Sequence, residues 1–192
     1  MKKLILAFAL LLSVVSFAQK KQTWKVDNYH SFLNFSIKHL GVSFVDGNFK
    51  SYEGTLEMDG DKIETGSFNF VVDANSINTG IEARDNHLKS ADFFDTASFG
   101  KITFVSKSIK KITKNNYILI GDLTIKNVTK KVTFNLVYGG KAANDGYGNE
   151  KLGFQATTKI NRFDFGVAYD PTGAAVGKEV NLQINLEFAK AK

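Results

Sequence analysis

The sequence has no cysteine and only one proline among its 192 residues. Without cysteine the chain has no disulfides, no thiol catalysis and no cysteine-based zinc site. An exported protein of this size needs no disulfide when its core is large. The single proline, Pro171, belongs to no proline-rich linker, and the sequence shows no repeat or low-complexity tract. We therefore expect one domain after the N-terminal segment.

A concentrated basic surface is also missing. Lys and Arg outnumber Asp and Glu by 25 to 19, but the basic residues are scattered, with only short pairs such as Lys110-Lys111. Nucleic-acid binding requires a clustered positive footprint, so we expect no nucleic-acid partner. The excess lysine fits a solvated face and the protection of strand edges.

Long apolar runs are absent beyond the N-terminus, which reads as a secretion signal. Lys2 and Lys3 precede a short apolar core at residues 4–15, and Ser16-Phe17-Ala18 has the small-x-small pattern of a cleavage site. The apolar core is shorter than the roughly 20 residues of a membrane span. We expect a cleavable signal peptide at residues 1–18, a mature domain at residues 19–192 and a periplasmic location without a stable membrane anchor. An uncleaved anchor is the alternative.

The dominant pattern of the remaining chain is an alternation of apolar and polar residues, which is typical of half-buried strands. In EVNLQINLEF, one face carries Val180, Leu182, Ile184, Leu186 and Phe188. About eight such runs follow one another through short connections, which favours antiparallel neighbours. Residues 43–58 read as one long strand bent at Gly47 or Gly54. One apolar face per strand fits an up-and-down barrel or a sandwich, and we favour the closed barrel because it has no exposed edge.

Phenylalanine is abundant, with 17 residues in the chain, and most fall on the inward faces. An eight-stranded barrel either fills its interior with side chains or holds one small ligand, and composition leaves both alternatives open. If the barrel is hollow, an acyl or prenyl chain that buries ten CH₂ groups gains roughly 8 kcal/mol of binding free energy before association costs. The expected ligand-binding wall comprises Leu33, Phe35, Ile37, Phe68, Phe70, Phe104, Phe134 and Phe154.

Two segments interrupt the alternation. Residues 76–100 contain a charged and aromatic insert, and its pattern predicts a short helix near residues 80–95, with Asn78 or Thr79 as the cap. Residues 161–179 are rich in glycine and aromatic residues and are too long for a simple hairpin. We expect this second segment to pack as a loop against one end of the barrel.

Five stretches, taken in order and spacing, resemble the YceI-like family of lipid- or polyisoprenoid-binding proteins. They are WKVDNYHSFLNFSIKHLGVSFVDGNFKSYEG, SINTGIEARDNHLKSADFFD, GKITFVS, GDLTIKNVTKKVTF and INRFDFGV. The resemblance extends over residues 23–188. It implies an all-β, elongated, lipocalin-like antiparallel barrel of the periplasm, whose apolar tunnel takes an isoprenoid or fatty-chain amphiphile. It implies no established enzyme activity and no cofactor.

The resemblance also gives the insert a position, near the opening of the barrel. The matching residues there are Arg84, Asp85, His87, Leu88, Phe93 and Phe94. Phe93, Phe94 and Phe99 would extend the apolar wall, and Arg84 and His87 could pair with a headgroup. Alternatively, Arg84 and Asp85 form an internal salt bridge that locks the insert, and His87 is a structural histidine.

Other chemistry finds little support in the sequence. The three histidines, His30, His39 and His87, match no metal-binding spacing, and no G-x-S-x-G motif is present. A lipid carrier is the preferred function, and we expect no enzyme. The alternatives are an isomerase or hydrolase that acts on a lipophilic substrate through Arg84, Asp85 and His87, or a packed barrel that serves only as an interaction module. Long strands and lipid traffic are compatible with a homodimer.

Overall fold

The computed structural model describes residues 21–191, so the expected signal peptide lies outside the described residues. Most of the described chain is β-structure, with one short α-helix and two 3₁₀ turns. The elements are β1 (Gln22–Val26), β2 (Phe32–His39), β3 (Ser43–Phe49), β4 (Tyr52–Asp59), β5 (Lys62–Asp73), η1 (Ala74–Ser76), β6 (Ile77–Asn78), α1 (Glu82–Lys89), β7 (Lys101–Lys111), β8 (Asn116–Ile125), β9 (Val128–Ala142), β10 (Lys151–Asn161), η2 (Arg162–Phe165) and β11 (Val176–Lys190). No described helix has the length and apolar character needed to cross a membrane.

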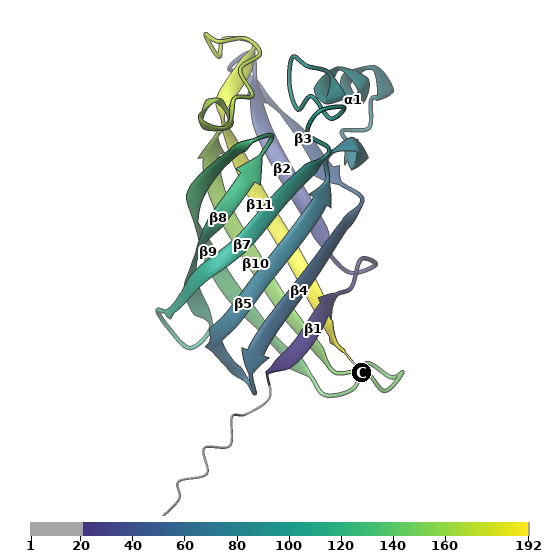
Figure 1. Ribbon diagram of the computed structural model, residues 1–192, viewed down its shortest axis with the longest axis vertical. Coiled ribbons are helices and arrows are strands. Elements are labelled where there is room, and N and C mark those ends of the chain that lie inside the picture. Colours follow the sequence, from purple (N-terminus) through teal and green to yellow (C-terminus); the bar gives the residue numbers. More distant parts are fainter. Residues whose placement is uncertain (1–20, 192) are drawn as a thin grey trace, which may run out of the picture.

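The strands form one antiparallel sheet that closes into an elongated barrel (Figure 1). Its strand order is β1-β4-β5-β7-β8-β9-β10-β11, and β1 pairs back with β11 to close the ring. β2 and β3 extend the positions of β1 and β4 toward one end, because β2 also pairs with β11 and β3 pairs with β2. This arrangement confirms the predicted eight-stranded antiparallel barrel.

The long strand predicted for residues 43–58 is divided in the structure. β3 ends at Phe49 and β4 begins at Tyr52, so the break falls at Lys50-Ser51 rather than at Gly47 or Gly54. The backbone N–H groups of both break residues turn to Ser76, which accepts at its carbonyl and its hydroxyl oxygen. The bend therefore depends on a partner from η1, distant in the sequence, and both glycines remain inside regular strands.

Tight turns join most neighbouring strands, as their sequences predicted. β4 and β5 meet around Gly60, which has a φ of 55°, and β8 and β9 meet at Lys126-Asn127, where Lys126 has a φ of 56°. Left-handed residues in two-residue hairpin loops match the right-handed twist of the flanking strands. Antiparallel order therefore follows from local turn geometry.

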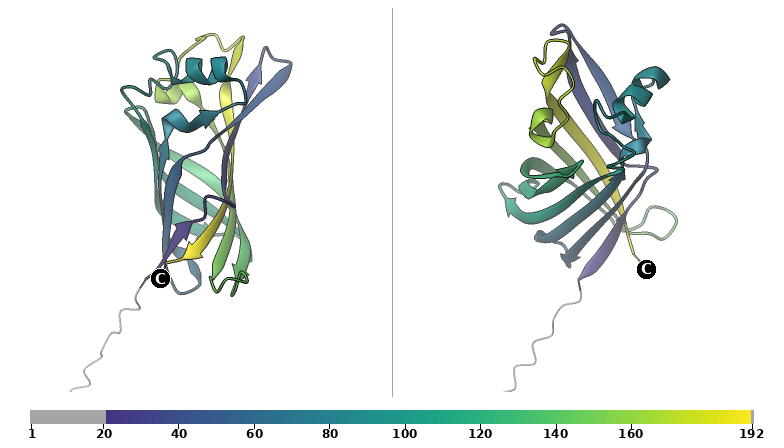
Figure 2. Two further views of the ribbon diagram at one scale, coloured as in Figure 1. Left: turned by 90° about the vertical axis from the view of Figure 1, so that its right-hand side faces the viewer. Right: turned by 45° about the horizontal axis from the view of Figure 1, so that its top comes forward.

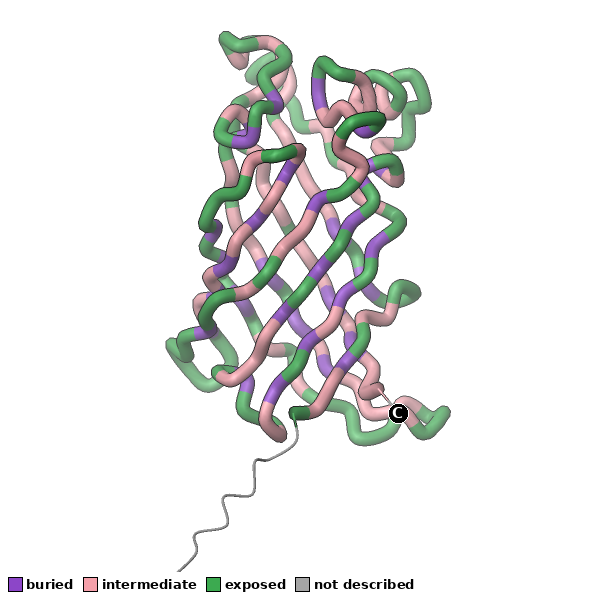
Figure 3. Tube along the Cα trace, viewed as in Figure 1, coloured by how far each residue is buried: buried purple, intermediate pink, exposed green. Residues whose placement is uncertain are grey.

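Inward and outward residues alternate along the strands, as the tube coloured by burial shows (Figure 3). Along β4, Tyr52, Gly54, Leu56 and Met58 are buried while Glu53 and Glu57 are exposed. Valine, isoleucine, threonine and aromatic residues suit such a half-buried pleated surface. The inward rows together form the single apolar core of the domain.

The insert and the segment after β10 lie at the same end of the barrel, away from the C-terminus (Figure 2). α1 forms within the stretch predicted to be helical, although its N-cap is Ile81 and no side chain caps it. The segment after β10 folds into η2 and a loop that packs against the end of the barrel, as predicted. Both interruptions of the alternation thus cover one opening of the same barrel.

Candidate functional site

The inner face of the barrel borders a cavity of about 210 Å³, whose lining extends to Leu88 of α1. It exceeds a ~150 Å³ apolar cavity, a size known to accept benzene. The aromatic rings therefore leave a hollow core. Ten of the predicted wall and insert residues line it: Leu33, Phe35, Ile37, Phe68, Phe70, Leu88, Phe93, Phe94, Phe104 and Phe134.

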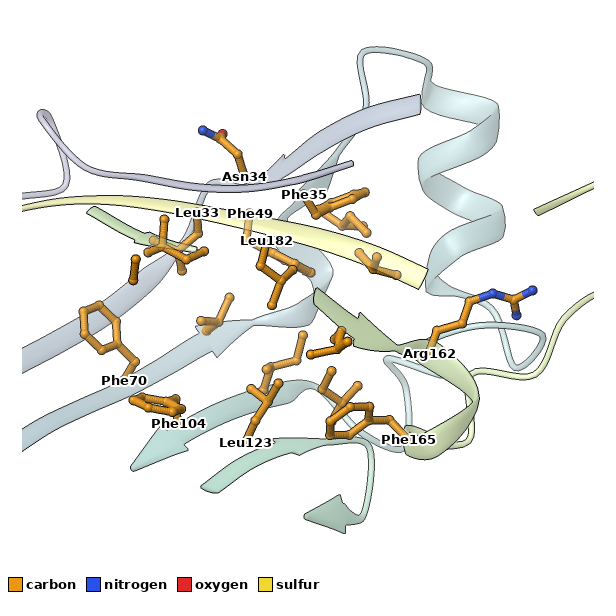
Figure 4. A pocket seen from close by; sticks show the side chains of 18 of the residues that line it. Leu33, Asn34, Phe35, Phe49, Phe70, Phe104, Leu123, Arg162, Phe165 and Leu182 are labelled. Atoms are coloured by element: carbon orange, nitrogen blue, oxygen red, sulfur yellow. The ribbon is translucent and has the colours of Figure 1, made fainter. Parts of the chain in front are cut away.

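Two of the three polar residues of the lining turn their polar ends elsewhere (Figure 4). The amide of Asn34 points away from Leu33 and Phe35, and the guanidinium of Arg162 points toward the loop that follows η2. A buried water requires two to four polar partners, and the cavity offers it almost none. Such a cavity favours an apolar guest over water.

The opposite end of the barrel is closed by aromatic packing. The rings of Phe68, Phe154 and Phe188 meet with centroids 5.5 to 6.0 Å apart, and Phe188 is 0% exposed. Trp24, also 0% exposed, has the ammonium groups of Lys141 and Lys190 within 5.8 Å of its ring centroid. Phe68 belongs both to this plug and to the cavity lining, whereas Phe154, which was predicted to belong to the ligand wall, does not line the cavity.

The insert supplies the wall at the other end. Leu88, from the last turn of α1, and Phe93 and Phe94, from the loop after it, line the cavity. Phe94 packs edge-on against Phe49 of β3, with centroids 5.9 Å apart, and Phe93 packs against Tyr169 at 4.6 Å. The insert and the segment after η2 are therefore joined over the opening by aromatic contacts.

Phe99, the third aromatic residue predicted for this wall, does not line the cavity. Its ring is half-buried and lies 5.8 Å from the ammonium of Lys126, which comes from the β8–β9 turn. A cation over an aromatic face is attracted by the ring quadrupole. Phe99 therefore packs beside the opening rather than within it.

Arg84 and Asp85 hold the insert together through a third residue, Thr79. The Arg84 guanidinium donates to the Thr79 hydroxyl at 2.7 Å and to its carbonyl at 2.8 Å. The Asp85 carboxylate accepts from the Thr79 backbone N–H and hydroxyl. The salt bridge considered between Arg84 and Asp85 is not formed in the described chain, and neither residue lines the cavity.

His87 is also engaged within the insert. Its Nε2 lies 2.9 Å from the Asp92 carboxylate, and its ring packs edge-on against Phe93 and Tyr169 at 5.0 Å. These contacts fit the structural alternative for His87. Arg84, Asp85 and His87 thus do not line the cavity; their contacts lie within the insert.

Arg162 is a residue of the cavity lining that the sequence reasoning missed. It is 4% exposed, and its guanidinium donates to the carbonyls of Gly177, Val167, Asp170 and Val176 at 2.8 to 3.2 Å. Burial lowers the pKa of this guanidinium, and the nearby Asp170 opposes the shift. The only sequence signal was a lone arginine beside aromatic residues in INRFDFGV.

Asp170 fixes the same loop from its other side. Its carboxylate accepts from the backbone N–H groups of Val176 and Ala175 and from the Thr172 hydroxyl. The hydrogen bond from Val176 leads these contacts, which lower the pKa of Asp170 from 3.8 to about 2. The loop presents Phe165 and Val167 to the cavity as a result.

One side-chain cluster has metal-binding spacing, although the sequence motifs gave no sign of it. Asp27, His30 and Glu187 bring their ligand atoms within 4.8 Å of one another at the closed end of the barrel. The Lys151 ammonium lies among them, 2.5 Å from Asp27 and 3.1 Å from Glu187. Partial burial raises the pKa of Asp27, but hydrogen bonds from Lys151, His30 and the Tyr29 N–H outweigh it and lower the pKa to about 2. The lysine supplies the positive charge that a cation would bring.

Comparisons with known proteins agree with this architecture. The family model of the YceI-like domain matches residues 24–188. A UPF0312 protein of Staphylococcus aureus (strain MSSA476) is 40% identical over 167 residues, which cover 85% of this chain and 95% of that protein.

Two solved structures extend the comparison. A Campylobacter jejuni YceI protein is 35% identical, with a TM-score of 0.73 over 81% of this chain and 90% of that one. A Saccharophagus degradans domain, described as polyisoprenoid binding and implicated in plant cell wall breakdown, shares the fold. It has 16% identity and a TM-score of 0.69 over 88% of this chain and 98% of that one.

Proposed function

The chain belongs to the YceI-like family, and from this premise we propose that it is a periplasmic carrier whose barrel holds a long isoprenoid or fatty chain. The observation that carries the proposal is the apolar cavity itself. The Saccharophagus degradans domain of the same fold is described as polyisoprenoid binding, which motivates the choice of ligand class.

The energetics favour such a guest without any catalytic group. Each CH₂ that leaves water contributes about 0.8 kcal/mol. A chain in a preformed cavity loses little to rearrangement of the protein, so this gain is offset mainly by association costs. Leu33, Leu182 and Phe104 approach the cavity from different strands (Figure 4), so a chain along the axis would contact apolar groups on several sides.

The headgroup has one place consistent with this arrangement. The aromatic plug closes the end near Trp24 and Phe188, and the cavity offers no polar partner within it. The polar end of the ligand therefore lies in solvent beside α1 and the loop after η2. Export by the predicted signal peptide would place the carrier in the periplasm, where lipids need a protein to cross the aqueous space.

Native mass spectrometry, followed by release and identification of the bound molecule, tests the proposal. Two neighbouring residues of β11 provide matched variants. Leu182 lines the cavity and the next residue, Gln183, is exposed on the outer face. Leu182→Trp fills the cavity, whereas Gln183→Trp adds the same side chain outside it.

We expect a lipid-sized adduct on the natural protein and on Gln183→Trp when each is purified from the periplasm, and a loss of the adduct on Leu182→Trp. A folded natural protein that carries no adduct, even after incubation with geranylgeraniol or hexadecan-1-ol, would contradict the proposal.

A further inference from the structure

Three phenylalanine rings of the cavity wall lie directly over glycines. A Cβ atom placed on Gly47 would be 2.3 Å from the ring of Phe35. The same atom would be 2.3 Å from the ring of Phe70 at Gly54, and 2.4 Å from the ring of Phe104 at Gly121. Ordinary contact begins near 3.4 Å, so no other residue leaves room for these rings where they are.

The pairing register explains two of these three contacts, those at Gly47 and Gly54. Gly47 is the direct cross-strand partner of Phe35, and Gly54 is the direct partner of Phe70. Cross-strand partners present their side chains on the same face of a sheet, so each missing Cβ is on the cavity side. The ring occupies the recess that the glycine leaves.

Phe70 and Phe104 are themselves partners across β5 and β7. Each ring covers the glycine on the strand beyond, Gly54 on β4 for Phe70 and Gly121 on β8 for Phe104. The two neighbouring rings therefore lie over glycines on opposite sides, Phe70 over Gly54 and Phe104 over Gly121, instead of both projecting toward the barrel axis. This packing extends over the four adjacent strands β4, β5, β7 and β8 and leaves the middle of the barrel open.

The third recess lies nearer the insert. Phe35 contacts Phe49 with ring centroids 5.9 Å apart, and Phe49 contacts Phe94 of the insert at 5.9 Å. Gly47 therefore controls the position of the first ring in an aromatic series that runs to the opening. Gly54 and Gly121 therefore affect the width of the middle of the cavity, and Gly47 affects its width nearer the insert.

We propose that Gly47, Gly54 and Gly121 set the bore of the cavity and so determine whether methyl-branched chains enter it. This inference rests on the proposed function. A Cβ at Gly47 or Gly54 would move the covering ring by roughly 1 Å, from about 2.3 Å to ordinary contact. At Gly121 the Cβ would also lie 2.7 Å from the Val105 carbonyl oxygen, so the backbone there would have to shift as well. The strand lies behind the ring, so the ring moves toward the axis. A methyl branch needs more width than an unbranched chain, so branched ligands are excluded first.

Competition binding with two probes measures this selectivity. Geranylgeraniol is methyl-branched and hexadecan-1-ol is not. For Gly47→Ala and Gly54→Ala, whose Cβ atoms meet only the covering ring, we expect the affinity ratio of the branched to the unbranched probe to fall by about fourfold for each methyl group excluded, the factor that corresponds to one buried CH₂. Gly153→Ala is the matched control, because a Cβ there meets nothing within 4 Å.

Replacing the phenylalanine ring should change the affinity ratio in the opposite direction. Phe70→Leu should raise the ratio, and Gly54→Ala combined with Phe70→Leu should restore the natural ratio, because the added Cβ no longer displaces a ring. If Gly54→Ala does not fold, Phe70→Leu and Phe104→Leu report on the same bore.

Unchanged ratios in all of these variants, with both probes bound by the natural protein, would overturn the inference and leave the carrier function intact. If the natural protein bound neither probe, the carrier function itself would fail.

Discussion

At the scale of single residues, Arg162 shows how a charge can serve an apolar site. Its guanidinium is buried, yet it bonds to four backbone carbonyls of the loop that precedes and begins β11. Its side chain borders the cavity while its charge is directed away from it. The residue gives the loop a fixed shape, and that shape positions Phe165 and Val167 in the wall.

Arg162→Met should therefore lower the free energy of unfolding by about 2–4 kcal/mol, because carbonyls lose hydrogen bonds from a charged donor. Urea unfolding followed by circular dichroism measures the change. Arg162→Lys should recover only part of the loss, since one ammonium cannot reach four carbonyls. Full stability in Arg162→Met would show that the loop is held by its apolar contacts alone.

The aromatic residues of the insert separate clearly in the structure. Phe93 and Phe94 line the cavity, whereas Phe99 packs against Lys126 beside it. Joint replacement of Phe93 and Phe94 by Asp should reduce lipid recovered with the purified protein by roughly tenfold or more, because carboxylates at the opening oppose apolar burial. Phe99→Asp is the control and should retain its lipid. Equal recovery from both would contradict the assignment of the opening.

Single residues also show where sequence reasoning ends. Alternation identified the wall positions Leu33, Phe35, Phe70 and Phe104, because inward orientation is a local property of a strand. It could not separate Phe154 from them, since both the plug and the wall use inward phenylalanines and only three-dimensional depth distinguishes them.

At the scale of elements, the helix and the bent strand illustrate different kinds of information. The α1 stretch was recognisable from its composition, and it forms as predicted. The break in the strand at residues 43–58 was misplaced, because it depends on Ser76, which is distant in the sequence. Interior glycine suggested a bend, but Gly47 and Gly54 instead accommodate aromatic rings.

The insert should be able to open locally without any change in the barrel strands. Thr79 joins Arg84 and Asp85 through its hydroxyl. Thr79→Val keeps the shape of the side chain and removes both of these bonds. We expect faster amide hydrogen exchange across residues 79–95 and unchanged exchange in the barrel strands. Thr113→Val, which removes a hydroxyl bonded to Asn116 in a hairpin turn, is the control. Unchanged exchange in the insert would show that Thr79 does not fasten it.

At the scale of the whole molecule, carboxylates with lowered pKa values link stability to pH, and three of them fall to about 2. Hydrogen bonds lower the pKa of Asp170, led by the bond from Val176, and of Asp145, led by the bond from Asn149, in each case to about 2. The pKa of Asp27 is also about 2, where burial is outweighed by Lys151 and His30. A pKa lowered by folding stabilises the native state above the unfolded value, near 4, and this contribution is lost as the pH falls toward 2.

Urea midpoints should therefore be constant from about pH 7 to pH 5 with respect to these groups and should decline between about pH 4 and pH 2. In Asp170→Asn, stability at pH 7 should be lower and the decline shallower, because one of the three groups no longer titrates. If the urea midpoint of Asp170→Asn fell with pH as steeply as that of the natural protein, the acid sensitivity would belong to other carboxylates.

At this scale the barrel architecture could be predicted from the sequence, whereas the ligand, the cellular location and the oligomeric state were the hardest properties to predict. Period-two alternation and short turns predicted an antiparallel barrel or sandwich, and the barrel was favoured because closure leaves no exposed edge. A homodimer, the periplasmic location and the identity of the ligand stay predictions. None of them follows from the packing inside one barrel.

The most direct test is a crystal structure of the protein with geranylgeraniol or hexadecan-1-ol. The account predicts continuous density for one chain along the barrel axis, in contact with Leu182, Phe35 and Phe104, with its hydroxyl beside α1. Density confined to the outer surface, or rings closed across an empty axis at saturating ligand, would contradict it.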